Sequence, residues 1–96
     1  MKQKNAIESL GALAHGTRLS IFRLLVAAGS EGLTPGKIIK RLKVAPATLS
    51  FHLKELTRAE LVTAQQVTRY IYYTVNFETV RDLMDYLTEN CCEGVR

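Results

Sequence analysis

The stretch that decides the fold covers residues 44–73 and is VAPATLSFHLKELTRAELVTAQQVTRYIYY. Proline is favoured at the first position of a helix, so Pro46 is expected to start a helix that runs to Arg58. Two segments rich in β-forming residues follow, at 61–66 and 70–75, with a polar tip between them. This order predicts a helix that leads directly into a β-hairpin arm.

A second helix is expected just before this one. Thr34 can cap a helix that starts at Pro35 and ends near Leu42. Residues 43–45 alone separate the two helices, which is the length of the turn in a helix-turn-helix unit. Leu49, Leu53 and Leu56 fall on one face of the second helix, and that face is expected to dock inward.

The rest of the chain predicts three more helices. Apolar spacing indicates a short first helix over about 5–14, and Gly16 separates it from a helix capped by Thr17 over about 18–28. This second helix is apolar nearly all round and is expected at the buried centre. Asn76 is expected to cap a last helix over about 77–90. The predicted fold class is mainly α (α+β): a winged helix-turn-helix of about five helices and a two-stranded hairpin wing, in a single domain over 1–96.

Charge is distributed unevenly along the 96 residues. The net charge is +4, but residues 1–58 hold ten Lys and Arg against three Asp and Glu, whereas residues 59–96 hold three against six. The positive half contains the predicted Pro46–Arg58 helix, where a surface that contacts phosphates would need it. The first residues do not resemble a signal peptide, and no apolar run approaches the length of a membrane span. We therefore expect a cytoplasmic protein that does not enter a membrane.

Four segments together resemble the ArsR/SmtB family of bacterial winged-helix repressors. They are LAHGTRL at 13–19, LSFHLKEL at 49–56, AELV at 59–62 and RYIYY at 69–73. The resemblance covers most of the chain, and it implies a homodimer whose first and last helices (about 5–14 and 77–90) form the interface. It further implies binding to double-stranded operator DNA as a transcriptional repressor, with ligand-controlled release. The chain departs from the family at 45–46, where Ala-Pro replaces the usual polar cap of the reading helix.

Within the helix predicted to read DNA, the N-terminal half supplies the candidate base contacts. Thr48 and Ser50 are candidates for base or phosphate contacts. The alternative interpretation is that they are ordinary solvated helix residues. Phe51 is suited to touch a thymine methyl group or, equally, to pack beside the wing. His52 lies at the edge of the inward face, so a buried structural histidine is as good an interpretation as a DNA contact.

Basic side chains are the candidate phosphate contacts. Lys54 and Arg58 share one side of the reading helix, and Lys43 lies in the turn before it, near Lys37, Lys40 and Arg41. The alternative for all of them is a solvated face. The hairpin tip is expected at Gln65, Gln66, Thr68 and Arg69, and an arginine there is suited to enter a minor groove.

Cys91 and Cys92 are the candidate sensor. Adjacent cysteines cannot build a disulfide framework, but soft thiolates prefer thiophilic ions. Some members of the resembled family sense trivalent arsenicals through a Cys-Cys pair at the end of the last helix, which implies trivalent arsenic or antimony as the inducer here. No resident cofactor is expected. The third ligand that arsenite favours is open: the second protomer, a small thiol, or none if the ligand is a methylated arsenical.

Three alternatives differ from this interpretation. The same DNA-binding fold can respond to oxidation of its thiols or to no ligand, or a winged helix can serve protein interaction without DNA. A catalytic role is not expected, because the sequence has neither a Gly-rich phosphate loop nor a His/Asp or carboxylate constellation beside the cysteines.

Overall fold

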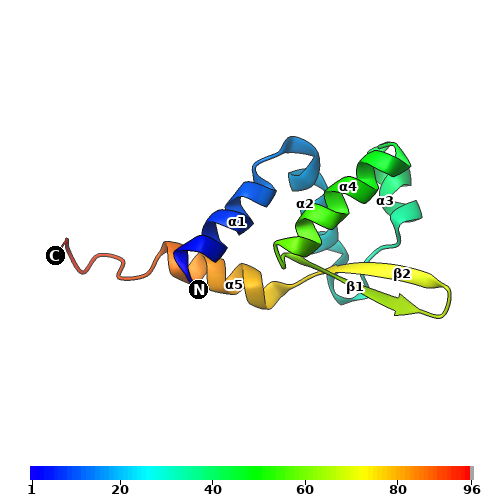
Figure 1. The fold of residues 1–96 in the computed structure, drawn as a ribbon. Helices are drawn as coiled ribbons and strands as arrows, with labels where there is room; N and C mark the ends of the chain where they lie inside the picture. Colours follow the sequence, from blue (N-terminus) through cyan, green and yellow to red (C-terminus); the bar gives the residue numbers. More distant parts are fainter. Residues whose placement is uncertain (96) are drawn as a thin grey trace.

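The computed structural model of the protein describes residues 1–95 (Figure 1). In these residues the chain forms five α-helices, a 3₁₀ turn (η1) and one antiparallel hairpin. In order they are α1 (Gln3–Leu13), α2 (Gly16–Ala28), η1 (Gly29–Glu31), α3 (Pro35–Leu42), α4 (Pro46–Arg58), β1 (Val62–Val67), β2 (Tyr70–Val75) and α5 (Phe77–Leu87). The predicted class, a mainly α fold with a helix-turn-helix unit and a hairpin wing, is confirmed.

The core lies where α2, α3 and α4 meet the base of the hairpin. Leu49, Leu53 and Leu56 of α4 point into it, as their spacing predicted. From α2, Ile21, Phe22 and Leu25 are buried, so α2 is the central helix. The predicted central position of α2 is confirmed, although two of its apolar side chains, Leu19 and Val26, are exposed on its outer side.

The hairpin is fixed to the body at its base. Strands β1 and β2 pair in register from Val62 opposite Val75 to Val67 opposite Tyr70. A β-bridge then ties β2 to the loop before α3, because Leu33 and Tyr73 exchange two backbone hydrogen bonds of 3.0 and 2.9 Å. Gly32 allows this approach: it has a φ of +67°, and a Cβ there would lie 2.5 Å from the Tyr73 carbonyl oxygen.

Several predicted boundaries need correction. The cap of α2 is His15 and not Thr17, since the His15 Nδ1 atom accepts a hydrogen bond of 3.2 Å from the Thr17 N–H. Helix α5 ends at Leu87 and not near Asn90, and the chain continues in turns. The caps Thr34 and Asn76 are confirmed, at 3.4 Å to the N–H groups of Lys37 and Thr79 respectively.

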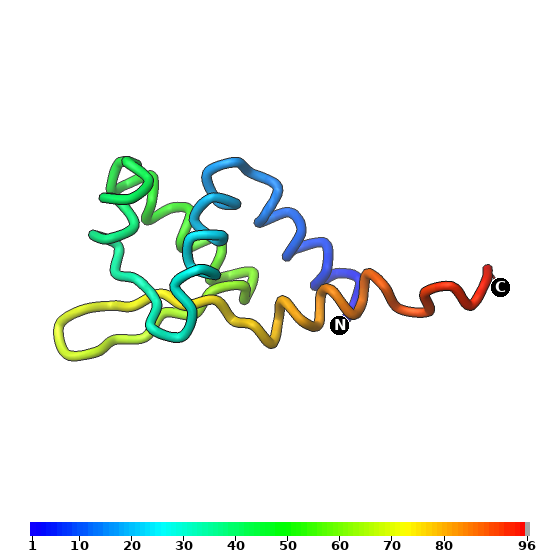
Figure 2. The backbone as a smooth tube through the Cα atoms, turned by 180° about the vertical axis from the view of Figure 1, so that it is seen from behind, coloured from blue at the N-terminus to red at the C-terminus, as the bar shows by residue number. Residues whose placement is uncertain are grey.

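The two terminal helices lie side by side at one end of the molecule (Figures 1 and 2). Their inner sides are covered, with Ala6 and Ser9 of α1 and Leu83 of α5 buried. The apolar side chains on their outer sides are not: Ile7 is 60% exposed, Met84 61% and Leu87 56%. None of the helices in the described part of the chain is long and apolar enough to cross a membrane.

Candidate nucleic-acid interface

Helix α4 presents a polar outer face beside its buried one. It starts at Pro46 after Ala45, whose side chain makes no capping hydrogen bond, as the sequence predicted. Thr48, Ser50 and Lys54 are all exposed on this outer face. The helix is anchored from below by three buried leucines, so these side chains are displayed on a rigid element. Such a helix has the form of one that enters a DNA major groove.

The two aromatic residues in the middle of α4 differ in burial. Phe51 is 57% exposed, although its ring lies edge-on to the His52 ring with centroids 5.4 Å apart. His52 is 5% exposed and faces the body. This burial favours the structural role for His52, since a direct DNA contact would require the side chain to leave the core.

His52 belongs to a small cluster that joins three helices. Arg18 donates from Nε to the Ala12 carbonyl oxygen of α1 at 2.7 Å, and its Nη1 lies 3.4 Å from Nδ1 of His52. A guanidinium has no acceptor, so Nδ1 of His52 accepts and the imidazole is neutral. The His15 ring lies against it, with centroids 4.7 Å apart. Burial first, and then positive charge at His15 and Arg18, hold the pKa of His52 below its usual range.

The basic side chains around α3 are exposed. Lys43 has a left-handed backbone, with a φ of 54°, and its N–H bonds to the Ile39 carbonyl at 2.7 Å, which closes α3 and sets up the turn. Helix α3 itself carries further exposed cations: Lys37, Lys40 and Arg41. They lie on the helix that precedes α4, where a basic surface supports contacts with a phosphate backbone.

The hairpin tip is shorter than predicted. Gln65 and Gln66 lie within β1, so the tip is the two-residue turn Thr68 and Arg69, with Thr68 at a φ of 57°. The Gln66 Nε2 donates to the Thr68 carbonyl at 3.3 Å, which steadies the turn. Arg69 is exposed at the end of the arm.

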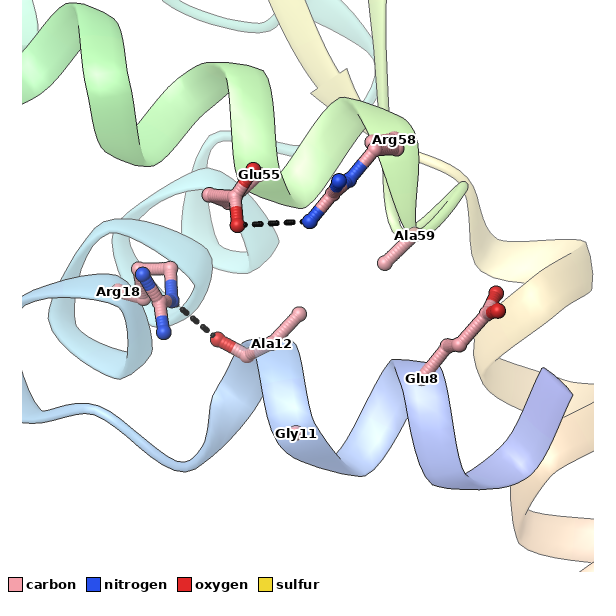
Figure 3. A pocket seen from close by; sticks show the side chains of 7 residues that line it. All are labelled: Glu8, Gly11, Ala12, Arg18, Glu55, Arg58 and Ala59. Carbon is pink, nitrogen blue, oxygen red and sulfur yellow. Dashed lines mark hydrogen bonds and ion pairs between the residues drawn. The ribbon is translucent and has the colours of Figure 1, made fainter. Parts of the chain in front are cut away.

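The structure sets Arg58 apart from the other predicted contacts. It is the last residue of α4 and donates from Nη2 to Oε1 of Glu55 at 2.9 Å. Figure 3 shows that it faces α1 across a cleft, at the opposite end of α4 from Thr48 and Ser50. Lys54 and Arg58 are four residues apart and share a side of α4, but Arg58 is paired with Glu55 at the end of the helix; its role as a phosphate contact stays a prediction.

The cysteines lie beyond α5 and not at its end. Cys91 donates its N–H to the Thr88 carbonyl at 3.0 Å in a turn, and both thiols are exposed. Their sulfur atoms lie 2.8 Å apart. The hydrogen bond with Cys92, and to a lesser degree desolvation, raise the pKa of the Cys91 thiol. Within residues 1–95 no group of three His, Cys, Asp or Glu side chains is arranged to hold a metal ion.

Sequence reasoning missed two residues that position the reading helix. They are His15, which caps α2, and Arg18, which connects α1 with α4. No local pattern in the sequence indicates that Arg18 reaches back to the Ala12 carbonyl of α1. Its partner His52 is 34 residues away, and that pairing depends on the tertiary fold.

Comparison with known proteins places this geometry in a family. Residues 13–65 match the family model described as "Helix-turn-helix domain". An uncharacterised helix-turn-helix transcriptional regulator of Methanocaldococcus jannaschii is 32% identical over 88 residues, which span 92% of this chain and 97% of that protein. The transcriptional activator HlyU of Vibrio cholerae is 28% identical to this chain. The alignment spans 93% of this chain and 80% of HlyU. The transcriptional repressor SdpR of Bacillus subtilis is 28% identical, with 79% of this chain and 81% of the repressor aligned.

Solved structures agree with this assignment. An ArsR-like regulator from Rhodococcus sp. RHA1 shares the fold with a TM-score of 0.83 at 23% identity, over 94% of this chain and 82% of that one. HlyU from Vibrio cholerae superposes with a TM-score of 0.73 at 28% identity, over 96% and 99% of the two chains. A homodimeric winged helix-turn-helix DNA-binding domain from Mycobacterium bovis gives 0.72 at 25% identity, over 88% and 83%. The characterised relatives are regulators of transcription and not enzymes. The chain therefore belongs to the helix-turn-helix domain family of transcriptional regulators, and its winged-helix fold is that of ArsR-like regulators.

Proposed function

We propose that this regulator is a homodimeric repressor that binds operator DNA and is released by trivalent arsenic or antimony bound at Cys91 and Cys92. The observation that carries the DNA-binding part is the two-sided character of α4. Its leucines are buried while Thr48, Ser50 and Lys54 are exposed next to a basic α3. Thr48, Ser50 and Phe51 would face base edges, and Lys43, Lys54 and the wing residue Arg69 would hold phosphates.

The terminal helices support the homodimer. The outer sides of α1 and α5 expose apolar side chains (Ile7, Leu10, Met84 and Leu87) that a monomer would leave in water. Clustered apolar exposure of this kind marks association surfaces. The Mycobacterium bovis relative is a homodimer with the same fold. Two copies related by a two-fold axis would place their α4 helices in successive major grooves of a palindromic operator, about one helical turn apart.

The chemistry of the thiol pair supports the ligand. Two exposed sulfur atoms on adjacent residues can both bond to one arsenic(III) or antimony(III) centre, because these ions prefer soft sulfur ligands. Each As–S bond would form as the thiol proton leaves with a hydroxide of the arsenic species as water, with no change in oxidation state. The pair supplies two of the three thiolates that arsenite favours. A methylated arsenical would need only these two, whereas arsenite would take the third from the partner protomer or a small thiol.

The release would be allosteric, because the thiols lie beyond α5 and far along the chain from α4. Ligand binding would order the turn after α5 and change how the two α5 helices pack in the dimer. A coupling free energy of about 1–3 kcal/mol, or roughly 5–150-fold in operator affinity, is enough for a switch of this kind. The reduced thiols and the DNA target fit action in the cytoplasm.

The test is operator-binding anisotropy of the wild type and of Cys91→Ser/Cys92→Ser. Each is titrated with arsenite, a trivalent methylarsenical, antimonite, zinc and peroxide. Wild type should leave the operator with the arsenicals or antimonite, and the double variant should stay bound. Equal release of both proteins, or release of neither, would show that the pair is not the sensor. Release by the methylarsenical alone would identify a two-thiolate ligand.

A redox signal at the same pair is the second candidate, and the short sulfur–sulfur separation favours it. Oxidation would join two adjacent residues in a strained ring, and the raised pKa of the Cys91 thiol lowers its thiolate fraction and hence its reactivity. The arsenical is therefore the preferred signal. Release by peroxide with no response to arsenicals would reverse that order.

A further inference from the structure

A polar cleft separates α1 from the C-terminal end of α4 (Figure 3). Its volume is about 350 Å³, within the range of about 300–1,000 Å³ typical of small-molecule sites. Gly11 and Ala12 of α1 form one wall, and no atom lies within 4 Å of where a Cβ on Gly11 would stand. The space is thus bounded by small residues on one side and by charged side chains on the others.

The four charged side chains around the cleft are not all paired. Arg58 and Glu55 satisfy one another at 2.9 Å. Arg18 is partly buried, and its two contacts are with neutral partners, the Ala12 carbonyl and the His52 ring. Within residues 1–95 no carboxylate lies within ion-pair distance of Arg18 or cation within that distance of Glu8. A guanidinium carries more N–H donors than these two contacts use.

The two uncompensated charges lie at opposite ends of the cleft (Figure 3). Arg18 stands beside Ala12, and Glu8 lies one helical turn earlier on α1, roughly 6 Å along the axis. The cleft therefore offers a positive end, a negative end and open space between them. A molecule that matches this arrangement carries a carboxylate and an ammonium group separated by an aliphatic spacer.

We propose that this cleft is a binding site for small amino carboxylates, with the carboxylate on Arg18 and the ammonium group on Glu8. The paired side chains of Arg58 and Glu55 line the α4 side of the cleft, where the ligand's polar atoms can contact them. The guanidinium that receives the carboxylate also contacts His52 of the reading helix, so occupancy of the cleft acts on α4 directly.

The site is distinct from the surfaces in the proposed function. At about 100° per residue, Glu8 and Ala12 lie on a different side of α1 from Ile7 and Leu10, whereas Gly11 lies about 40° from Ile7, where the cleft borders the apolar face. The cleft also lies at the opposite end of α4 from Thr48 and Ser50. A ligand can therefore enter while the apolar face and the reading face stay free.

The experiment is calorimetric titration of the full chain, without DNA or arsenical, with three probes. ε-Aminocaproate carries both charges, whereas caproate and hexylamine each carry one. We expect saturable binding of ε-aminocaproate, about tenfold tighter than either half-probe, because each charged end adds a charge-assisted hydrogen bond. Absence of saturable binding, or equal affinity for ε-aminocaproate and caproate, would overturn the proposal.

Three variants locate the binding. Glu8→Gln should lower the affinity for ε-aminocaproate about tenfold and leave that for caproate unchanged, because only the ammonium contact is lost. Gly11→Leu should abolish binding of both probes by filling the cleft, and the open space there allows it to fold. Glu31→Gln removes the same charge outside the cleft and should bind as wild type. Unchanged affinity in both Glu8→Gln and Gly11→Leu would place the binding elsewhere. Because no operator or arsenical is present, that failure would leave the proposed function standing.

Discussion

Helices α4 and α5 each carry a stripe of apolar side chains along one face, but the two stripes differ in how far they are buried. On α4, Leu49, Leu53 and Leu56 are buried by the chain's own core. On α5, Leu83 is buried while Met84 and Leu87 stay exposed. Hydrophobic periodicity therefore predicts that a helix face will be covered but not which molecule covers it. In this chain the stripe on α4 builds the core, whereas the stripe on α5 stays exposed and would be covered only in the proposed dimer.

The largest expected effect is the loss of stability on shortening a buried leucine of α4. Leu56→Ala should lower the free energy of unfolding by about 3 kcal/mol, because it leaves a cavity beneath α4. Urea denaturation at low protein concentration measures this loss. Leu87→Ala is the same chemical change on the exposed stripe and should cost well under 1 kcal/mol there. Equal losses would mean that the two stripes do not differ in the way described.

Two glycines near the base of the wing have similar backbone conformations but different surroundings. Gly32 and Gly29 have φ angles of +67° and +66°, but only Gly32 lies against another backbone. Gly32→Ala should lower the free energy of unfolding by about 2–3 kcal/mol through backbone strain and displacement of β2, and Gly29→Ala by only about 1 kcal/mol. Thermal unfolding of both variants gives the difference. A Gly29→Ala variant as unstable as Gly32→Ala would remove the contact with Tyr73 as the cause.

The exposed stripe is expected to matter for assembly. Met84→Glu should shift the protein toward monomer in sedimentation velocity and weaken operator binding at least tenfold, or about 1.4 kcal/mol, because both half-sites are no longer bound together. Leu19→Glu places the same charge on an exposed position of α2 and should leave the sedimentation coefficient unchanged. A monomeric wild type at micromolar concentration would contradict the proposed dimer.

The smallest effect concerns pH and the buried side of α4. The pKa of His52 is lowered by burial, with smaller contributions from His15 and Arg18, so below its ordinary value near 6.5 the unfolded chain binds more protons than the folded one. Stability should therefore fall as the pH drops from 7.5 through 6.5 toward the lowered pKa. The urea midpoint at each pH checks this, and His52→Gln should show a shallower fall. A midpoint that rises on acidification would contradict the neutral His52 assignment.

Much of the fold was predictable because it depends on local signals. The turn at residues 43–45 follows from Pro35 and Pro46, and the hairpin from β-forming residues on either side of a polar turn. The end of α5 was not predictable in this way, since Thr88 and Asn90 neither forbid nor strongly favour a helix. His15 was overlooked as a cap because Ser, Thr, Asp and Asn dominate that position.

The candidate site was predictable to a similar extent. The outer face of α4 follows from the inward leucines, which fix the orientation of every other side chain on the helix. The placement of Arg58 beside α1 does not follow, because it depends on how a helix more than forty residues earlier packs against α4. The Arg18–His52 contact has the same origin. Sequence patterns identify which side of an element is exposed, whereas the neighbour across a gap is a property of the whole fold.

Strand β2 joins the tip of the wing to the start of α5. It passes from the wing tip to Asn76, whose N–H bonds to the Leu61 carbonyl at 2.9 Å, and α5 begins at the next residue. The β-bridge to Leu33 holds the strand at Tyr73, so the arm from Tyr73 to Tyr70 extends roughly 10 Å. A tilt of about 5° at Tyr73 displaces the tip by roughly 1 Å with no change inside the hairpin. The position of Arg69 therefore depends on how Tyr73 is held against Leu33.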